Sequence, residues 1–100
     1  MIVEIQVLPL GTGSPSVSEY VAEAVKVLRD KGLNFKVTPM ATVFEIDNFS
    51  QISDVLDEIR KRMEARGIKR VVFVIRIDYR SDKELKMDRK VESVMKRIRD

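Results

Sequence analysis

"NFKVTPMATVFEI", residues 34–46, contains two short apolar stretches, 34–38 and 41–46, whose connection consists of little more than Pro39 and Met40. A connection of this length leaves no room for a helix, and proline is typical of a tight turn. The two stretches are therefore predicted to be neighbouring antiparallel strands of a hairpin.

A strand and a helix are predicted before this hairpin. Residues 2–8 alternate apolar and polar side chains, as a half-buried strand does. An apolar helical stripe then runs from Ser16 to Gly32, and Ser16 with Glu19 fits a capping box at its start.

After the hairpin, the periodicity predicts an amphipathic helix at about 50–66 and the most apolar strand of the chain at 70–79. Strand, helix, two strands, helix and strand is the order of a ferredoxin-like sandwich. This is an α+β fold in which two helices cover one face of a four-stranded antiparallel sheet. A further helix at about 83–99 is an addition to it. We expect one domain over residues 1–100, since one hydrophobic core occupies a chain of this length.

Composition narrows the class of protein. The chain is 44% hydrophobic and 35% charged, with no His and no Cys, which predicts a globular domain without disulfides, zinc or another cofactor. No apolar run approaches the roughly 18 residues of a membrane span, so we expect a cytoplasmic protein that does not bind membranes. The abundance of Lys, Arg and Glu is typical of thermophiles.

The positive charge is concentrated at one end of the chain. Residues 1–79 carry 11 basic and 11 acidic side chains, so the net charge of +3 arises in residues 80–100. Acidic residues interrupt that segment throughout, whereas a nucleic-acid footprint is a patch of one sign. We therefore expect no nucleic-acid partner.

The face of the sheet without helices meets either water or a partner. Alternation along the last strand directs one set of side chains toward the helices: Val71, Phe73, Ile75, Ile77 and Tyr79. The valines on the other face favour self-association, whereas the charged residues also fit ion pairs on a solvated sheet. The predicted interface comprises Glu4, Gln6, Val72, Val74, Arg76 and Asp78, with Val43 and Glu45 beside it. The terminal helix offers a second association surface or packs on its own sheet.

Catalysis has few candidate residues. The chain lacks an imidazole base, a Gly-x-Ser-x-Gly sequence and a complete phosphate-binding loop, so we do not expect an enzyme. Residues 11–16, "GTGSPS", provide backbone amides that could hold an anion or a polar ligand edge, or they form only a turn and a cap. The loop lacks the Arg of an acylphosphatase, and the strands lack the exposed aromatics of an RNA-recognition motif.

Three segments resemble the small single-domain thiamine-binding (YkoF-like) proteins: "VLPLGTGSPSVSEYVAEAV" at 7–25, "VTPMATVFEID" at 37–47 and "IRIDYRSDKELKMDRKVESV" at 75–94. The resemblance implies a ferredoxin-like protomer that assembles into a dimer or tetramer through its open sheet face. It also implies that the protein binds thiamine or hydroxymethylpyrimidine without catalysis. Ala41 occupies the position where that family usually has glycine, and its methyl group is expected to narrow the pocket.

On this basis the predicted ligand-binding residues are Thr12, Ser16, Ser18, Tyr20, Met40, Thr42 and Glu45. Glu45 would contact the pyrimidine or the cation, Thr42 and Ser18 would form hydrogen bonds, and Met40 and Tyr20 would be pocket walls.

Each of these roles has a structural alternative. Tyr20 also fits the core, Met40 the hairpin turn, and Glu45 an ion pair with Arg76. Asp78 and Arg80 are interpreted mainly as a structural or interface pair. The competing function is an oligomeric scaffold or regulatory module that binds another metabolite or a protein.

Overall fold

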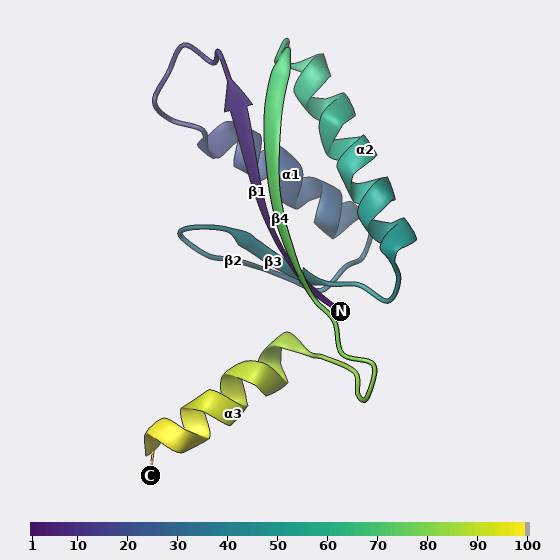
Figure 1. Ribbon diagram of the computed structural model, residues 1–100. Helices are drawn as coiled ribbons and strands as arrows, with labels where there is room; N and C mark the ends of the chain where they lie inside the picture. Colours follow the sequence, from purple (N-terminus) through teal and green to yellow (C-terminus); the bar gives the residue numbers. More distant parts are fainter. Residues whose placement is uncertain (100) are drawn as a thin grey trace.

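The computed structural model describes residues 1–99, in which it has four strands and three helices (Figure 1). In chain order they are β1 (Ile2–Leu10), α1 (Ser18–Asp30), β2 (Phe35–Val37), β3 (Thr42–Glu45), α2 (Phe49–Ala65), β4 (Arg70–Asp78) and α3 (Met87–Arg99). This is the predicted order of elements, and the hairpin at residues 34–46 is formed by β2 and β3.

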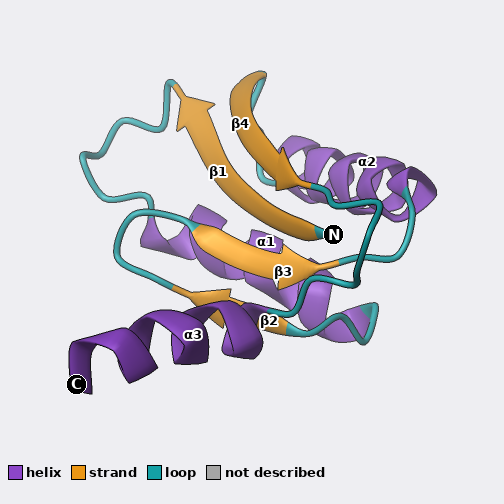
Figure 2. Ribbon diagram, turned by 60° about the horizontal axis from the view of Figure 1, so that its bottom comes forward, coloured by secondary structure: helices purple, strands orange, loops and turns teal. Residues whose placement is uncertain are grey.

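The four strands form one antiparallel sheet in the order β2-β3-β1-β4. The helices α1 and α2 pack on one face of it, and α3 lies on the opposite side (Figure 2). The prediction of an α+β, ferredoxin-like sandwich is confirmed, because two β-α-β units meet in one sheet with a hairpin between them.

Regularly spaced apolar side chains explain how the two helices cover the sheet. In α1 the buried residues are Tyr20, Ala24, Val27 and Leu28, and in α2 they are Val55, Ile59 and Met63. These spacings of three and four residues align the side chains along one stripe of each helix. The stripes pack against Val3, Ile5 and Val7 of β1 and Phe44 of β3, and each fully buried side chain of this kind contributes about 1.5–3 kcal/mol.

The strands differ in length, which leaves part of β1 without a neighbour on one side. β1 pairs with β4 over Ile2–Leu10, but β3 pairs only with Ile2, Val3, Glu4 and Ile5. Beyond Ile5, no strand formed by residues 1–99 lies beside the edge of β1 that faces the hairpin. A gap in the sheet therefore opens at the turn of the hairpin.

The predicted capping box of α1 is wrong. The helix begins at Ser18, and Val17 is its N-cap residue without a side-chain cap. The Val17 carbonyl accepts hydrogen bonds from the amides of Tyr20 and Val21. With Ser16 as the N-cap residue the helix would begin at Val17, which is one residue before its observed start. A capping box is present instead at α2, between Asn48 and Gln51.

The helix predicted at 83–99 begins only at Met87. Leu85 and Met87 are buried, whereas Val91, Val94 and Ile98 are exposed along the remaining stripe. Only the start of α3 is attached to the sheet, and the rest of the helix extends away from the sandwich (Figure 1).

Two side chains predicted to face the helices are not covered by them. Ile77 is 39% exposed and Tyr79 lies beyond the end of β4, where it is also exposed. β4 is one of the two edge strands of the sheet, so its end receives less cover from α1 and α2 than the central strands do.

Among residues 1–99, no helix is both long and apolar enough to cross a membrane.

Candidate functional site

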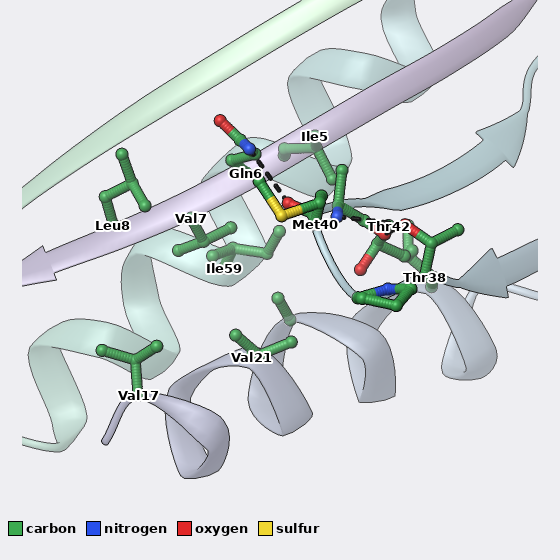
Figure 3. A pocket seen from close by; sticks show the side chains of 14 residues that line it. Ile5, Gln6, Val7, Leu8, Val17, Val21, Thr38, Met40, Thr42 and Ile59 are labelled. Atoms are coloured by element: carbon green, nitrogen blue, oxygen red, sulfur yellow. Dashed lines mark hydrogen bonds between the residues drawn. The ribbon is translucent and has the colours of Figure 1, made fainter. Parts of the chain in front are cut away.

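An apolar cavity of about 180 Å³ lies where β1 loses its contact with β3 (Figure 3). One side is formed by β1 at Ile5–Leu8, another by α1, and a third by the connection between β2 and β3. Ile59 of α2 contributes from the helix layer. The cavity is thus a consequence of strand length, because a longer β3 would occupy this space.

The lining is mostly apolar, with an amide and two hydroxyls as its polar side chains. The apolar residues are Ile5, Val7, Leu8, Val17, Val21, Ala24, Leu28, Pro39, Met40, Ala41 and Ile59, and the polar ones are Gln6, Thr38 and Thr42. A few polar groups in an apolar cleft are typical of a small-molecule site.

Within residues 1–99 there is no cluster of three or more His, Cys, Asp or Glu side chains that could hold a metal ion.

The mouth of the cavity is shaped by two side chains that fasten the hairpin turn. Gln6 Nε2 donates a hydrogen bond of 2.9 Å to the carbonyl oxygen of Met40, as Figure 3 shows. Thr38 Oγ1 donates to the Ala41 carbonyl at 2.7 Å and accepts from the Ala41 amide at 3.1 Å. The turn is therefore held at a fixed distance from β1, with the Met40 side chain 79% exposed at the mouth.

Thr42 is the buried polar residue that lines the cavity. It is the first residue of β3, it is 5% exposed, and its side chain lines the cavity. A buried hydroxyl can donate one hydrogen bond and accept others, so Thr42 can orient a polar ligand edge.

The volume limits what can enter. Pockets for drug-sized ligands measure about 300–1,000 Å³, whereas an apolar cavity of about 150 Å³ admits benzene. At about 180 Å³, this cavity accommodates one substituted six-membered ring. A ligand with two ring systems would keep the second at the mouth, beside Met40.

Comparison with known proteins gives this geometry a context. Residues 3–95 match the family described as thiamine-binding protein. This chain belongs to the thiamine-binding protein family. The resemblance stated from the sequence is therefore confirmed. A relative in this family, the UPF0045 protein YqgV of Bacillus subtilis, is 36% identical over 101 residues, which cover 97% of this chain and 96% of the relative.

Solved structures agree in fold. The protein MJ1052 of Methanocaldococcus jannaschii has a TM-score of 0.80 and 31% identity, and the match covers 93% of both chains. A Thermotoga maritima protein whose description refers to thiamine biosynthesis or salvage has a TM-score of 0.76 and 26% identity, over 93% of this chain and 96% of its own.

In this member of the thiamine-binding protein family, the cavity contains two of the predicted ligand residues, Met40 and Thr42. The loop at 11–16 does not line it, and its hydroxyls bond to one another and to the loop backbone instead. Thr12 Oγ1 donates to the Ser14 carbonyl at 2.9 Å, and the hydroxyls of Ser16 and Ser18 are 3.2 Å apart. Tyr20 is buried in the hydrophobic core.

Glu45 lies at the far end of β3 and anchors α3. Its Oε2 accepts a hydrogen bond of 2.6 Å from the Met87 amide, and its Oε1 accepts one of 2.9 Å from Asn34. Partial burial alone would raise the pKa of this carboxyl. The hydrogen bonds from Asn34 and Met87, with the nearby charge of Lys86, outweigh that effect and lower the pKa below its usual 4.5.

The predicted interface residues share the open face of the sheet. Glu4 and Arg76 lie opposite each other in register and form an ion pair at 2.8 Å, and the hydrogen bond from Arg76 lowers the pKa of Glu4. Asp78 and Arg80 do not pair with each other as predicted. Asp78 pairs with Lys90, and Arg80 pairs with Asp82, because α3 and its preceding loop bring these partners closer.

Several lining residues were not predicted. Val17, Val21 and Ile59 belong to helical apolar stripes, and such side chains have the same pattern whether they face a core or a cavity. Gln6 was predicted at the interface, but it also reaches the cavity, since it lies just past the last β1 residue paired with β3. Ala41 also lines the cavity. This position is a precondition for the predicted effect, that its methyl group narrows the pocket.

Proposed function

We propose that this protein binds thiamine, or its hydroxymethylpyrimidine moiety, in the cavity between β1, α1 and the hairpin turn. The observation that carries this proposal is an apolar space of about 180 Å³ with the buried residue Thr42 in its lining, in a chain of the thiamine-binding protein family. The reference to thiamine biosynthesis or salvage for the Thermotoga maritima neighbour supports the same class of ligand.

The pyrimidine ring is the part of thiamine that suits the interior. A neutral aminopyrimidine can pack against Val17, Val21 and Ile59 while its polar edge bonds to the Thr42 hydroxyl. The thiazolium ring carries a positive charge, and burying it among apolar side chains without a carboxylate would be costly. In intact thiamine that ring therefore lies at the mouth, beside the polarisable sulfur of Met40.

Binding without catalysis is part of this proposal. The polar side chains that line the cavity are those of Gln6, Thr38 and Thr42, and an amide or an alkyl hydroxyl is a poor proton donor or acceptor at neutral pH. A general acid or base would need to be within about 3 Å of the ligand. The site is suited to holding a ligand unchanged.

Self-association is also part of the proposed function. Leu8, Leu10, Val72 and Val74 are exposed on the open face of the sheet, and Val91, Val94 and Ile98 are exposed on α3. Apolar area of this extent commonly marks an interface, so we expect a homo-oligomer rather than a monomer. A scaffold protein, which is the competing function, would use the same surfaces. Ligand titration distinguishes the two functions, because only the binding protein is expected to bind thiamine or hydroxymethylpyrimidine.

Isothermal titration calorimetry tests the ligand. The purified chain is titrated with hydroxymethylpyrimidine, with thiamine and with the thiazole half of thiamine. We expect saturable binding of the first two near one site per chain, and weaker or absent binding of the thiazole. An absence of heat and of thermal shift with all three at millimolar concentration would refute the ligand. Tighter binding of the thiazole than of the pyrimidine would refute the orientation.

A further inference from the structure

The five methionines differ widely in exposure, and the most exposed one lies at the mouth of the cavity. Met40 is 79% exposed, whereas Met95 on α3 is 39% exposed. Met63 and Met87 are buried, and Met1 is partly buried against the hydrophobic core. An oxidant dissolved in water has to reach the sulfur atom, so Met40 is the methionine that it meets most readily.

The surroundings of Met40 are apolar. Leu8 of β1 and Val17 at the start of α1 line the cavity, and both are exposed, as side chains at its rim are. The Met40 side chain extends from the hairpin turn toward β1 (Figure 3). A thioether sulfur makes favourable contacts with aromatic rings. The Met40 sulfur is therefore placed to contact the part of a ligand that protrudes from the cavity.

The position of this residue depends on its backbone and not on its sulfur. Gln6 Nε2 donates a hydrogen bond to the Met40 carbonyl, and Thr38 Oγ1 bonds to both the carbonyl and the amide of Ala41. A chemical change at the Met40 sulfur leaves all three hydrogen bonds in place. Such a change would alter the mouth of the cavity without releasing the hairpin turn.

We propose that Met40 is a site of reversible oxidation that controls the affinity of the cavity for thiamine. Hydrogen peroxide transfers one oxygen atom to the Met40 sulfur: the O–O bond breaks, an S–O bond forms, and the second oxygen leaves as water. The sulfur loses two electrons and the peroxide gains them. The product is methionine sulfoxide, which is polar and which methionine sulfoxide reductases convert back to methionine.

The sulfoxide weakens the contact at the mouth. Its oxygen accepts hydrogen bonds, which water provides and the apolar Leu8 and Val17 do not, so the oxidised side chain turns toward water. The Gln6 amide is already bonded to the Met40 carbonyl.

Oxidation affects the two ligands differently. This inference rests on the proposed function, in which the thiazolium ring of thiamine lies beside Met40 and the pyrimidine ring lies inside. We expect thiamine affinity to fall by about 2- to 12-fold, the worth of one sulfur–aromatic contact. Hydroxymethylpyrimidine has its single ring inside the cavity and should lose little affinity.

Peptide mass spectrometry tests the selectivity of oxidation. The purified chain is treated with increasing concentrations of hydrogen peroxide, and sulfoxide is measured at each methionine. We expect Met40 to be oxidised first, Met95 next, and Met63 and Met87 last, in the order of their exposure. The midpoint of chemical unfolding should not change while Met40 alone is oxidised. Oxidation of Met95 before Met40, or a lower midpoint at that stage, would overturn the proposal.

Calorimetry tests the effect on the ligands. Thiamine and hydroxymethylpyrimidine are titrated into the chain before oxidation, after selective oxidation, and after treatment with methionine sulfoxide reductases. We expect oxidation to weaken thiamine binding and reduction to restore it. Met40→Leu is the control, since leucine is apolar but has no sulfur, so peroxide should leave its thiamine affinity unchanged. Met95→Leu keeps Met40 and should respond to peroxide as the unmodified chain does.

The outcomes separate this inference from the proposed function. If the chain binds thiamine equally well before and after oxidation of Met40, the inference is wrong and the proposed function stands. A loss of affinity that peroxide also causes in Met40→Leu would overturn the inference, because another residue would be responsible. If the unoxidised chain binds neither ligand, the inference and the proposed function both fail.

Discussion

Gln6 Nε2 lies 2.9 Å from the carbonyl oxygen of Met40, and this hydrogen bond joins the free edge of β1 to the turn of the hairpin. The two residues are 34 positions apart in the chain and both line the cavity. The bond fixes the width of the mouth at the point where β3 no longer supports β1.

Replacing Gln6 with Glu removes this bond with little change in size, because a carboxylate cannot donate a hydrogen bond to a carbonyl. We expect affinity for the pyrimidine to fall several-fold and stability to fall by about 0.5–1.5 kcal/mol, the usual worth of one hydrogen bond. Calorimetry and chemical unfolding measure both quantities. Glu4→Gln is the control, since Glu4 lies on the same strand face but not at the cavity. Equal losses of affinity in the two variants would contradict the role of Gln6.

Thr42→Val removes the interior hydroxyl while it keeps the shape of the side chain. We expect pyrimidine affinity to fall by about 5- to 150-fold, which corresponds to the 1–3 kcal/mol cost of an unpaired polar group on the ligand. Stability should fall little, because valine keeps the volume of this side chain, which is only 5% exposed. Thr42→Ser keeps the hydroxyl and should retain most of the affinity. Unchanged binding by Thr42→Val would show that the ligand lies elsewhere.

Ala41→Gly removes a methyl group from the cavity lining. We expect thiamine affinity to rise relative to hydroxymethylpyrimidine, since the larger ligand gains more from a wider mouth. The flexible glycine should cost about 0.4–1 kcal/mol of stability. Ala41→Val fills the same space and should weaken both ligands. If the ratio of the two affinities is the same in all three proteins, Ala41 does not set the pocket size.

Glu45→Gln tests the anchor of α3 by its pH dependence. The pKa of Glu45 is below 4.5 in the folded protein, so its charge stabilises the fold above that pH. The contribution is lost as the pH falls from about 5 through the lowered pKa of the folded state. We expect Glu45→Gln to be about 1 kcal/mol less stable at pH 7, and this difference should shrink as the pH falls below 4.5. A stability difference that does not change with pH would contradict this account.

The same variant separates the anchor from the ligand site. Glu45 lies outside the cavity, so Glu45→Gln should bind the pyrimidine as tightly as the unmodified chain does. A loss of affinity without a loss of stability would assign Glu45 to the ligand instead.

The order of the elements could be predicted from the sequence because each has a local signal. Alternation identifies β1 and β4, and the spacing of apolar residues identifies α1 and α2. The short connection around Pro39 and Met40 was sufficient to predict the hairpin and, with it, the ferredoxin-like topology.

The cavity could be predicted only in part, because it depends on where one strand stops pairing with another. The hairpin turn pointed to Met40 and Thr42, but the end of the β1–β3 ladder at Ile5 is a tertiary feature that leaves no local pattern. For the same reason Glu45 could be taken for a ligand group. Its partner, the Met87 amide, is 42 residues away, and periodicity alone placed the start of α3 four residues too early.

The most direct test of the account is the methyl NMR spectrum of the chain during titration with hydroxymethylpyrimidine. The account predicts that the methyl signals of Val17, Val21, Thr42 and Ile59 shift together and saturate at one ligand per chain, because these side chains line the cavity. The signals of Val91 and Val94 on α3 should not move. Shifts confined to α3 or to the loop at 11–16, with the four cavity methyls unchanged, would contradict it.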